Sequence, residues 1–275
     1  EEIEALSGNE FDLAFLEDAA FRGNWAPESI ATALDAALDD PRADIVLTLG
    51  MGASTLAARR DALPKPVVVP LVMDATLFGF PDEGGYSGRT NLTYLGAPET
   101  VSKDIEAFYA LAPFEHLAIL VNEVLLEMMP GLRANYARLL EPYGAMATVV
   151  PVGDSVDEAL AAIPAEADAA YVGVLLHFDE AQRAALFEGL IGKELPAFTM
   201  WGREDVLLGA MASQRPRDNL RYLARRIALN VQRILLGDDP STLQTTYPQR
   251  SDLTINIATA QAVHVYPSWD VLLEA

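Results

Sequence analysis

Residues 44–60 read DIVLTLGMGASTLAARR, an apolar run that ends in two glycines and leads at once into a helical pattern. A buried strand that passes through a short turn into a helix is the repeating unit of parallel α/β proteins. A glycine turn of this kind can bind a phosphate, line a ligand cleft or simply redirect the chain. These three uses imply different functions, and the remaining sequence has to decide between them.

Short apolar strands and amphipathic helices alternate along the whole chain. A first series starts at FDLAFLED (11–18) and reaches PVVVPLVM (66–73), and a second runs from HLAILVN (116–122) to LTINIATAQA (253–262). This order predicts an α/β fold with two Rossmann-like lobes of similar size, on either side of about residue 115. Because no flexible Gly/Ser linker separates the two series, we expect several stiff crossings and an interlobe ligand cleft.

Proline and glycine mark the expected helix boundaries. Pro27 is typical of the first turn of a helix, and the helical pattern behind it runs to Asp39. A long helix is expected over 123–140, with an interruption at Pro130. A helix with a basic face is expected over 217–236, because a glycine and a proline follow it.

The chain is strongly acidic. Its 275 residues include 40 Asp plus Glu against 19 Lys plus Arg, which gives a net charge of −21. Such a surface repels phosphate backbones and anionic headgroups, so we expect no nucleic-acid partner and no binding to a membrane surface. No apolar run approaches the roughly 20 residues that span a bilayer.

Residue types that bind metals or form covalent intermediates are scarce. The chain has no cysteine, which excludes disulfides, thiolate metal sites and cysteine nucleophiles. His116, His177 and His264 do not have the spacing of a histidine metal site, and no DxDxDG loop occurs. We therefore expect no metal and no cofactor.

The sequence favours a protein that is not an enzyme, since the nucleophile-elbow pattern GxSxG is absent. One enzyme hypothesis stays open, a dinucleotide-binding fingerprint. Gly50 and Gly52 follow a strand and open a helix, and Asp74 ends the next strand, where an acid would hold ribose hydroxyls. Thr55 takes the place of the third glycine, however, and no Lys or Arg lies in the turn to meet a pyrophosphate.

Asn91 begins Asn-Leu-Thr, which has the pattern of a glycosylation acceptor. Asn side chains also brace irregular loops by bonding to nearby backbone, and we predict this structural use for Asn91.

Six short motifs occur in a fixed order at wide spacing. They are DIVLTLGMGAST (44–55), VVVPLVMDATLFGF (67–80), SGRTNLTYLG (87–96), HLAILVN (116–122), LLGAMAS (207–213) and LTINIATAQA (253–262). Together they resemble the ABC-type substrate-binding proteins of the type I periplasmic-binding fold. The subgroup is the one that includes tryptophan and tyrosine binders and many members of unknown ligand. The resemblance covers about residues 11–275.

The resemblance implies two lobes joined by three crossings. The N-terminal lobe would hold residues 1–114 plus 206–250, and the C-terminal lobe residues 115–205 plus 251–275. Residues 1–6 resemble the end of the family's first helix, so we expect the first strand and helix of the N-terminal lobe to be missing from this chain.

The chain departs from the family in the lobe that bears the ligand. Asp74 is followed by Ala75, where the family has Asp-Pro. The loop over 80–90 is longer and contains the acidic residues Asp82 and Glu83. These departures leave altered or lost ligand binding open as an alternative to ligand capture.

We expect the ligand at the carboxyl ends of the strands, where open α/β sheets place it. The candidate contacts are Met51, Ser54, Asp74 and Thr76 from the first lobe, and Asn122, His177 and Trp201 from the second. Ser54 would present a hydroxyl and a helix N-terminus to a carboxylate, Asp74 would accept from an ammonium group, and Trp201 would stack on a flat ligand. Structural uses stay open for each: Ser54 and Asp74 as caps, Trp201 as a core residue.

The resemblance implies a non-enzymatic solute-binding protein that captures a small molecule, an amino acid or a similar small polar solute, between two lobes. Its partner would be the permease of an ABC-type importer or another envelope protein. Its location would be periplasmic or extracytoplasmic, with a lipid anchor as an option for the full-length protein. A non-transport sensor or envelope-associated scaffold is the first alternative and the dinucleotide-binding enzyme the second, because one fold hosts many roles.

Overall fold

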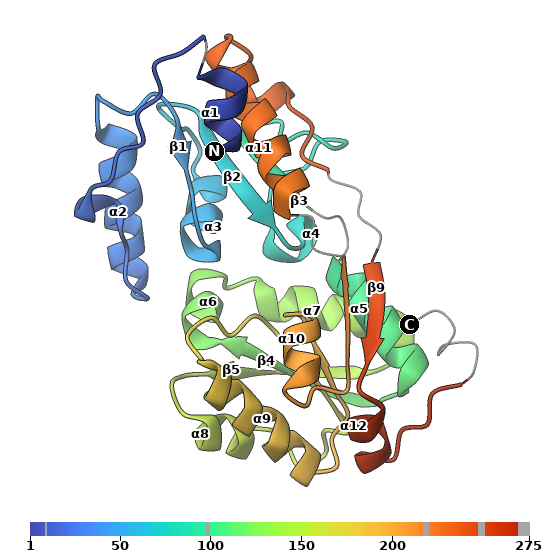
Figure 1. The fold of residues 1–275 in the computed structure, drawn as a ribbon. Helices are drawn as coiled ribbons and strands as arrows, with labels where there is room; N and C mark the ends of the chain where they lie inside the picture. Colours follow the sequence, from blue (N-terminus) through green and yellow to red (C-terminus); the bar gives the residue numbers. More distant parts are fainter. Residues whose placement is uncertain (9, 97–99, 217–219, 247–250, 269–275) are drawn as a thin grey trace. The chain divides into compact units, whose positions relative to one another are not determined.

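The computed structural model describes residues 1–8, 10–96, 100–216, 220–246 and 251–268 (Figure 1). The chain divides into two compact units. Unit 1 comprises Glu1–Glu99, Glu127–Met129 and Asp218–Pro248, and unit 2 comprises Thr100–Leu126, Pro130–Arg217 and Gln249–Ala275. Every helix in the described part of the chain is too short or too polar to span a bilayer.

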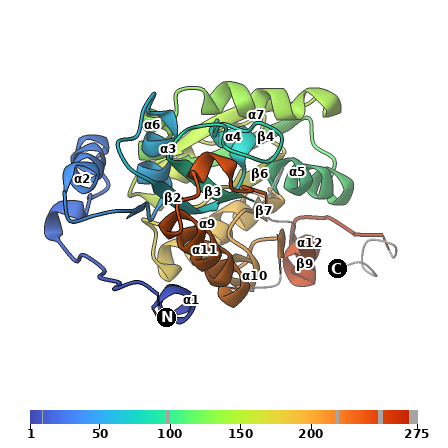
Figure 2. The same ribbon diagram turned by 90° about the horizontal axis from the view of Figure 1, so that it is seen from above.

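Unit 1 is built on a parallel sheet. Its strands are, in spatial order, β1 (Val46–Leu47), β2 (Val67–Val72) and β3 (Leu92–Gly96). Its helices are α1 (Glu2–Ser7), α2 (Pro27–Asp39), α3 (Met51–Arg59), α4 (Ala75–Phe78) and α11 (Leu220–Leu235), with 3-10 turns at Ala19–Phe21 and Pro240–Thr242. Helix α11 covers one face of β2 and α3 lies on the other (Figure 2). The α11 face buries Val68 of β2 against Val231 and Ile234.

Unit 2 is built on a mixed sheet with the spatial order β5-β4-β6-β7-β8-β9. The strands are β4 (His116–Asn122), β5 (Met146–Val152), β6 (Ala169–Val172), β7 (Ala197–Thr199), β8 (Ala212–Pro216) and β9 (Ser251–Ile255). All neighbours are parallel except β8 and β9, which pair antiparallel and so differ from the parallel arrangement that the alternation predicted. The chain leaves β4 toward β5 on one side and returns to β6 on the other, which makes a topological switch point between β4 and β6.

Helices cover both faces of the unit 2 sheet. They are α5 (Thr100–Leu111), α6 (Glu123–Met128, whose last two residues group with unit 1), α7 (Leu132–Leu140), α8 (Val156–Ala161), α9 (Glu180–Gly192), α10 (Arg203–Leu207) and α12 (Ile257–Ala262), with a 3-10 turn at Glu141–Tyr143. Ala118 and Leu120 of β4 pack in the cluster under α8 and α9. Across the sheet, Phe108 of α5 packs against Phe198 of β7, with ring centroids 5.3 Å apart. Burial on both faces explains the unbroken apolar run of β4.

Several predicted boundaries are confirmed. Helix α2 begins at Pro27 and ends at Asp39, and the break at Pro130 separates α6 from α7. The strand predicted over 11–18 is wrong, because these residues form no strand and Phe15 is 53% exposed. A strand needs a neighbour to satisfy its backbone groups, and the described residues place none beside this segment.

The division between the units falls at different residues from the lobe boundaries that the resemblance implies. Helix α5 and residues 206–217 belong to unit 2. Strand β8 pairs with β7 and β9, and Asp104 of α5 accepts a hydrogen bond of 2.7 Å from the Tyr171 hydroxyl of β6. These contacts between distant segments hold α5 and β8 in unit 2.

Asn91 braces the loop before β3, as predicted. Its φ of 64° lies in the left-handed region, which Asn tolerates better than most residues. Its Nδ2 donates to the Leu63 carbonyl at 2.9 Å. Thr93, the third residue of the acceptor pattern, is fully buried. The Asn91 amide therefore has a structural use.

Replacing Asn91 by alanine is expected to lower the free energy of unfolding by about 1–2 kcal/mol. Alanine would keep the unfavourable left-handed backbone and lose the hydrogen bond. Urea denaturation measures the difference. Asn91→Gly is the matched control: it relieves the backbone cost and should be less destabilised than Asn91→Ala. Equal stability of the alanine variant and the wild type would contradict the bracing role.

Candidate ligand-binding site

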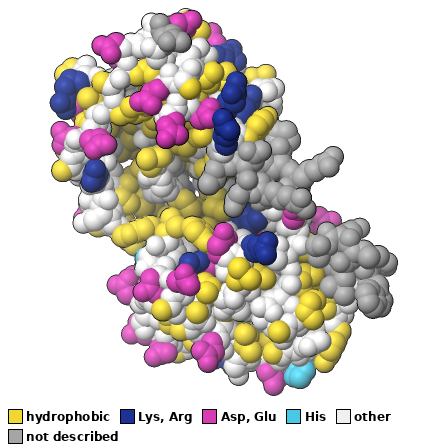
Figure 3. Space-filling model, viewed as in Figure 1, with side chains coloured by type: hydrophobic (Ala, Val, Ile, Leu, Met, Phe, Trp, Pro, Cys, Tyr) yellow, Lys and Arg dark blue, Asp and Glu magenta, His cyan; other side chains and the backbone are white. Residues whose placement is uncertain are grey.

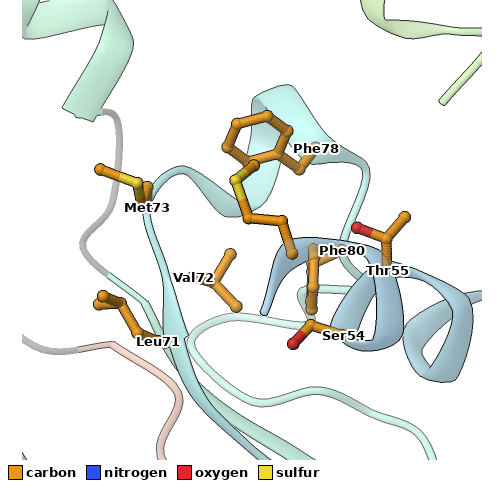
Figure 4. A pocket seen from close by; sticks show the side chains of 8 residues that line it. Ser54, Thr55, Leu71, Val72, Met73, Phe78 and Phe80 are labelled. Carbon is orange, nitrogen blue, oxygen red and sulfur yellow. The ribbon is translucent and has the colours of Figure 1, made fainter. Parts of the chain in front are cut away.

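A shallow pocket lies beside the carboxyl ends of β1 and β2 in unit 1. The turn through Gly50, with a φ of 99°, carries the chain from β1 directly into α3, a conformation that favours glycine. The pocket is open to solvent and is lined by Met51, Ser54, Thr55, Leu71, Val72, Met73, Phe78 and Phe80 (Figure 4). None of these side chains is charged. The glycine turn that opens α3 therefore contributes to the wall of a pocket.

Two polar side chains at this edge of unit 1 form hydrogen bonds with other residues of the unit. Ser54 is 3% exposed, and its hydroxyl lies 3.2 Å from the Thr48 hydroxyl and 3.3 Å from the Thr48 carbonyl oxygen. Asp74 is 1% exposed, and its Oδ1 accepts the Leu77 backbone N–H at 2.8 Å as the N-cap of α4. Thr76 is exposed in the first turn of α4. Asp74 therefore has the capping use that the sequence left open, whereas Ser54 does not cap α3, whose N-cap is Gly50, and bonds to Thr48 instead.

The capping role of Asp74 also bears on the dinucleotide hypothesis. That hypothesis needs the Asp74 carboxylate to accept hydrogen bonds from ribose hydroxyls. The carboxylate is buried and already accepts a backbone donor. The structure therefore gives this carboxylate a partner inside the fold.

In unit 2, Asn122 and His177 meet at the switch point between β4 and β6. Asn122 Oδ1 accepts the Leu125 backbone N–H at 3.2 Å, so its Nδ2 faces His177 Nδ1 at 2.7 Å and donates to it. His177 Nε2 then donates to the Gly153 carbonyl at 3.0 Å. This chain joins the loops that follow β4, β5 and β6. Both side chains therefore shape the carboxyl edge of the sheet.

Trp201 is held at the same edge by a chain of hydrogen bonds. Its backbone N–H donates to the Thr199 hydroxyl at 3.1 Å, which donates to Asp205 Oδ2 at 2.7 Å. Arg183 Nη1 lies 2.5 Å from Asp205 Oδ1, and its guanidinium carbon is 5.6 Å from the centroid of the Trp201 ring. The Trp201 side chain itself is not a core residue, since Trp201 is 38% exposed.

Asp205 supplies the buried carboxyl group of this cluster. The residue is 2% exposed, and burial raises the pKa of its carboxyl although Thr199 and Arg183 act to lower it. Loss of hydration therefore outweighs the ion pair, as is common for buried pairs. Asp205 positions Arg183 and, through Thr199, the backbone of Trp201.

Sequence reasoning missed several residues of the two edges. Leu71 lies near the end of β2 and Met73 directly follows the strand, so both lie close to the expected carboxyl end. Thr55, which stands where a dinucleotide fingerprint would need its third glycine, follows Ser54 on α3 and lines the pocket. Arg183 and Asp205 come from α9 and α10, and no spacing in the sequence joins them.

Comparisons with known proteins agree with this architecture. No protein-family model and no curated protein matches the chain. A solved ABC domain in complex with L-Trp from Streptococcus pneumonia is similar, at 17% identity over 90% of this chain and 85% of that chain, with a TM-score of 0.68. A LacI family transcriptional regulator from Mycobacterium smegmatis has 15% identity over 92% and 90% and a TM-score of 0.58.

A further similar structure is the ligand-free, open form of a substrate-binding protein with adhesive properties from Clostridium difficile. It has 16% identity over 98% of this chain and 90% of that chain, with a TM-score of 0.55. At these identities the likeness establishes the fold alone. The chain has the two-lobe α/β fold of the type I periplasmic-binding proteins, as its ordered motifs predict.

Proposed function

We propose that this protein is a non-enzymatic, extracytoplasmic solute-binding protein that closes its two units on a small molecule. The observation that carries the proposal is the uncharged pocket at the carboxyl ends of β1 and β2, where this fold class places its ligands. The exposed Trp201 at the carboxyl edge of the unit 2 sheet supports it as a second contact. The L-Trp complex of the similar ABC domain shows that a protein of this fold can hold a small molecule.

Closure would work as a shift of an equilibrium. A ligand that contacts both units only in the closed state favours that state by the difference in binding free energy. The closed form would then be the one that a membrane permease of an ABC-type importer recognises. Of the expected contacts, Met51, Thr76 and Trp201 would touch the ligand directly, whereas Asn122 and His177 would shape the edge.

An envelope-associated role without transport is the second candidate. One observation favours it: a protein of similar fold from Clostridium difficile has adhesive properties. Acidic side chains are scattered over the visible face of both units, which would suit contacts with a basic partner surface (Figure 3). A sensor role would also suit the fold, since a transcriptional regulator is among the similar structures.

A ligand is expected to raise the melting temperature of the protein clearly. A small molecule at 100 times its dissociation constant stabilises the folded state by about 2.7 kcal/mol. We would screen amino acids, nucleosides, sugars, small acids and neutral apolar compounds by thermal shift. Small-angle scattering should then show a smaller radius of gyration with each hit. If no compound stabilises the protein and an envelope protein co-purifies with it, the scaffold role replaces solute binding.

A further inference from the structure

The polar side chains expected to hold an amino acid are already used within the fold. Ser54, Asp74, Asn122 and His177 each make hydrogen bonds inside their own unit. Asp74, the expected partner of an ammonium group, is both buried and bonded to backbone. These side chains are therefore already held by hydrogen bonds within the fold.

The surface around the unit 1 pocket is apolar. Leu71, which lines the pocket, is 50% exposed. Met51 and Met73 are partly exposed in the lining itself. Exposed apolar side chains gathered at a pocket are typical of a binding surface, because a ligand that covers them removes apolar area from water.

One neutral hydrogen-bonding group faces this apolar surface. Thr55 lines the pocket, and its hydroxyl has no hydrogen-bond partner among the described residues. Figure 4 shows the Thr55 hydroxyl turned toward Phe78, whereas the Ser54 hydroxyl is turned away from Phe78 and Phe80. The lining therefore offers contacts to an apolar body and to one uncharged polar group.

We propose that the ligand is an uncharged molecule with an aromatic or branched aliphatic body and one hydroxyl or similar group, which binds at Thr55. This inference rests on the proposed function and names its ligand class. An ionised group buried without a partner is strongly unfavourable, and the pocket lining supplies no opposite charge. The ligand therefore differs from an amino acid in lacking the ammonium and carboxylate groups.

Calorimetric titration with matched pairs tests the ligand class. The pairs are indole-3-ethanol with L-tryptophan and 3-methylbutanol with L-leucine, which share a body and differ in the charged groups. We expect at least one alcohol to bind tenfold or more tightly than its amino acid. Tighter binding of an amino acid, or hits only among charged compounds, overturns the ligand class and leaves solute binding intact. No binding by these pairs or by the broad screen overturns solute binding itself.

Two variants locate the ligand in the pocket. Met51→Asp puts a charge into the lining, while an acid in the first turn of α3 suits the helix dipole. Met146→Asp is the matched control, at the exposed start of β5 in unit 2. We expect Met51→Asp to weaken binding of the alcohol tenfold or more and Met146→Asp to leave it unchanged. Equal effects of the two variants on binding would show that the ligand does not bind in this pocket.

Thr55→Val tests the hydrogen bond separately. Valine has nearly the shape of threonine but no hydroxyl. We expect Thr55→Val to weaken binding of the alcohol about tenfold. Binding of 3-ethylindole, which has no hydroxyl, should be unchanged. Equal losses of binding affinity for both compounds would show that Thr55 contributes only packing. That result would overturn its role as the polar contact.

Discussion

Replacing Asp205 by alanine is expected to lower the free energy of unfolding by about 3 kcal/mol, because it breaks a buried ion pair and leaves its partner without compensation. Asp205 is 2% exposed, and its carboxylate receives both the Thr199 hydroxyl and the Arg183 guanidinium. Urea denaturation monitored by circular dichroism measures the loss. Because the same carboxylate supports Trp201 through Thr199, tryptophan fluorescence of the folded variant should change as well.

Two control variants separate the buried pair from a general effect of charge. Glu204→Ala removes an exposed carboxylate from the same helix and should change stability by less than about 0.5 kcal/mol. Asp205→Asn keeps the shape and one acceptor and should be less destabilised than Asp205→Ala. A similar small loss in Asp205→Ala and Glu204→Ala would show that the pair adds nothing to stability.

The pH dependence of the same variants gives an independent check. Burial raises the pKa of Asp205 above its usual 3.8, so between these two values the folded state holds the proton more tightly than the unfolded state. The contribution of Asp205 to stability is therefore largest below pH 3.8 and falls as pH rises through the raised pKa. Asp205→Asn should remove this fall. A wild type and an asparagine variant with parallel pH profiles would contradict the raised pKa.

Replacing Tyr171 by phenylalanine is expected to cost about 2 kcal/mol, because a buried carboxylate loses a hydrogen-bond donor. The Tyr171 hydroxyl donates to Asp104 Oδ2 at 2.7 Å, and Tyr171 and Asp104 are 0% and 1% exposed. Burial and the charge of Asp104 raise the pKa of Tyr171 well above its usual value, so the hydroxyl stays protonated as a donor. Phenylalanine keeps the stacking on Phe198 and removes only the hydroxyl.

The Tyr171 prediction also tests why α5 belongs to unit 2. Tyr109→Phe, on the same helix as Asp104, removes a hydroxyl for which the described residues offer no hydrogen-bond partner and should be close to neutral. Hydrogen exchange of α5 amides should rise in Tyr171→Phe and stay unchanged in Tyr109→Phe. Unchanged exchange and stability in both variants would show that the hydrogen bond does not hold α5 on the sheet.

The candidate site shows how far sequence reasoning reached. Met51 and Ser54 line the pocket because both follow the glycine turn on one helix, and such a relation is local. Asn122 and His177 were both expected at the carboxyl ends of strands, and they meet because β4 and β6 are neighbours in the sheet. The sequence left two uses open for Asp74, and only the structure shows that its carboxylate caps α4.

The sequence by itself determined the α/β class, most strands and helices, and the ordered motifs of the fold, because periodicity, helix caps and glycine turns act between near neighbours. Only the tertiary structure decided that the segment at 11–18 is not a strand and that α5 and β8 belong to unit 2. It also decided that Arg183, Thr199 and Asp205 converge behind Trp201. Hydrogen bonds and ion pairs between distant segments depend on how the sheets pack, and sequence spacing does not contain that information.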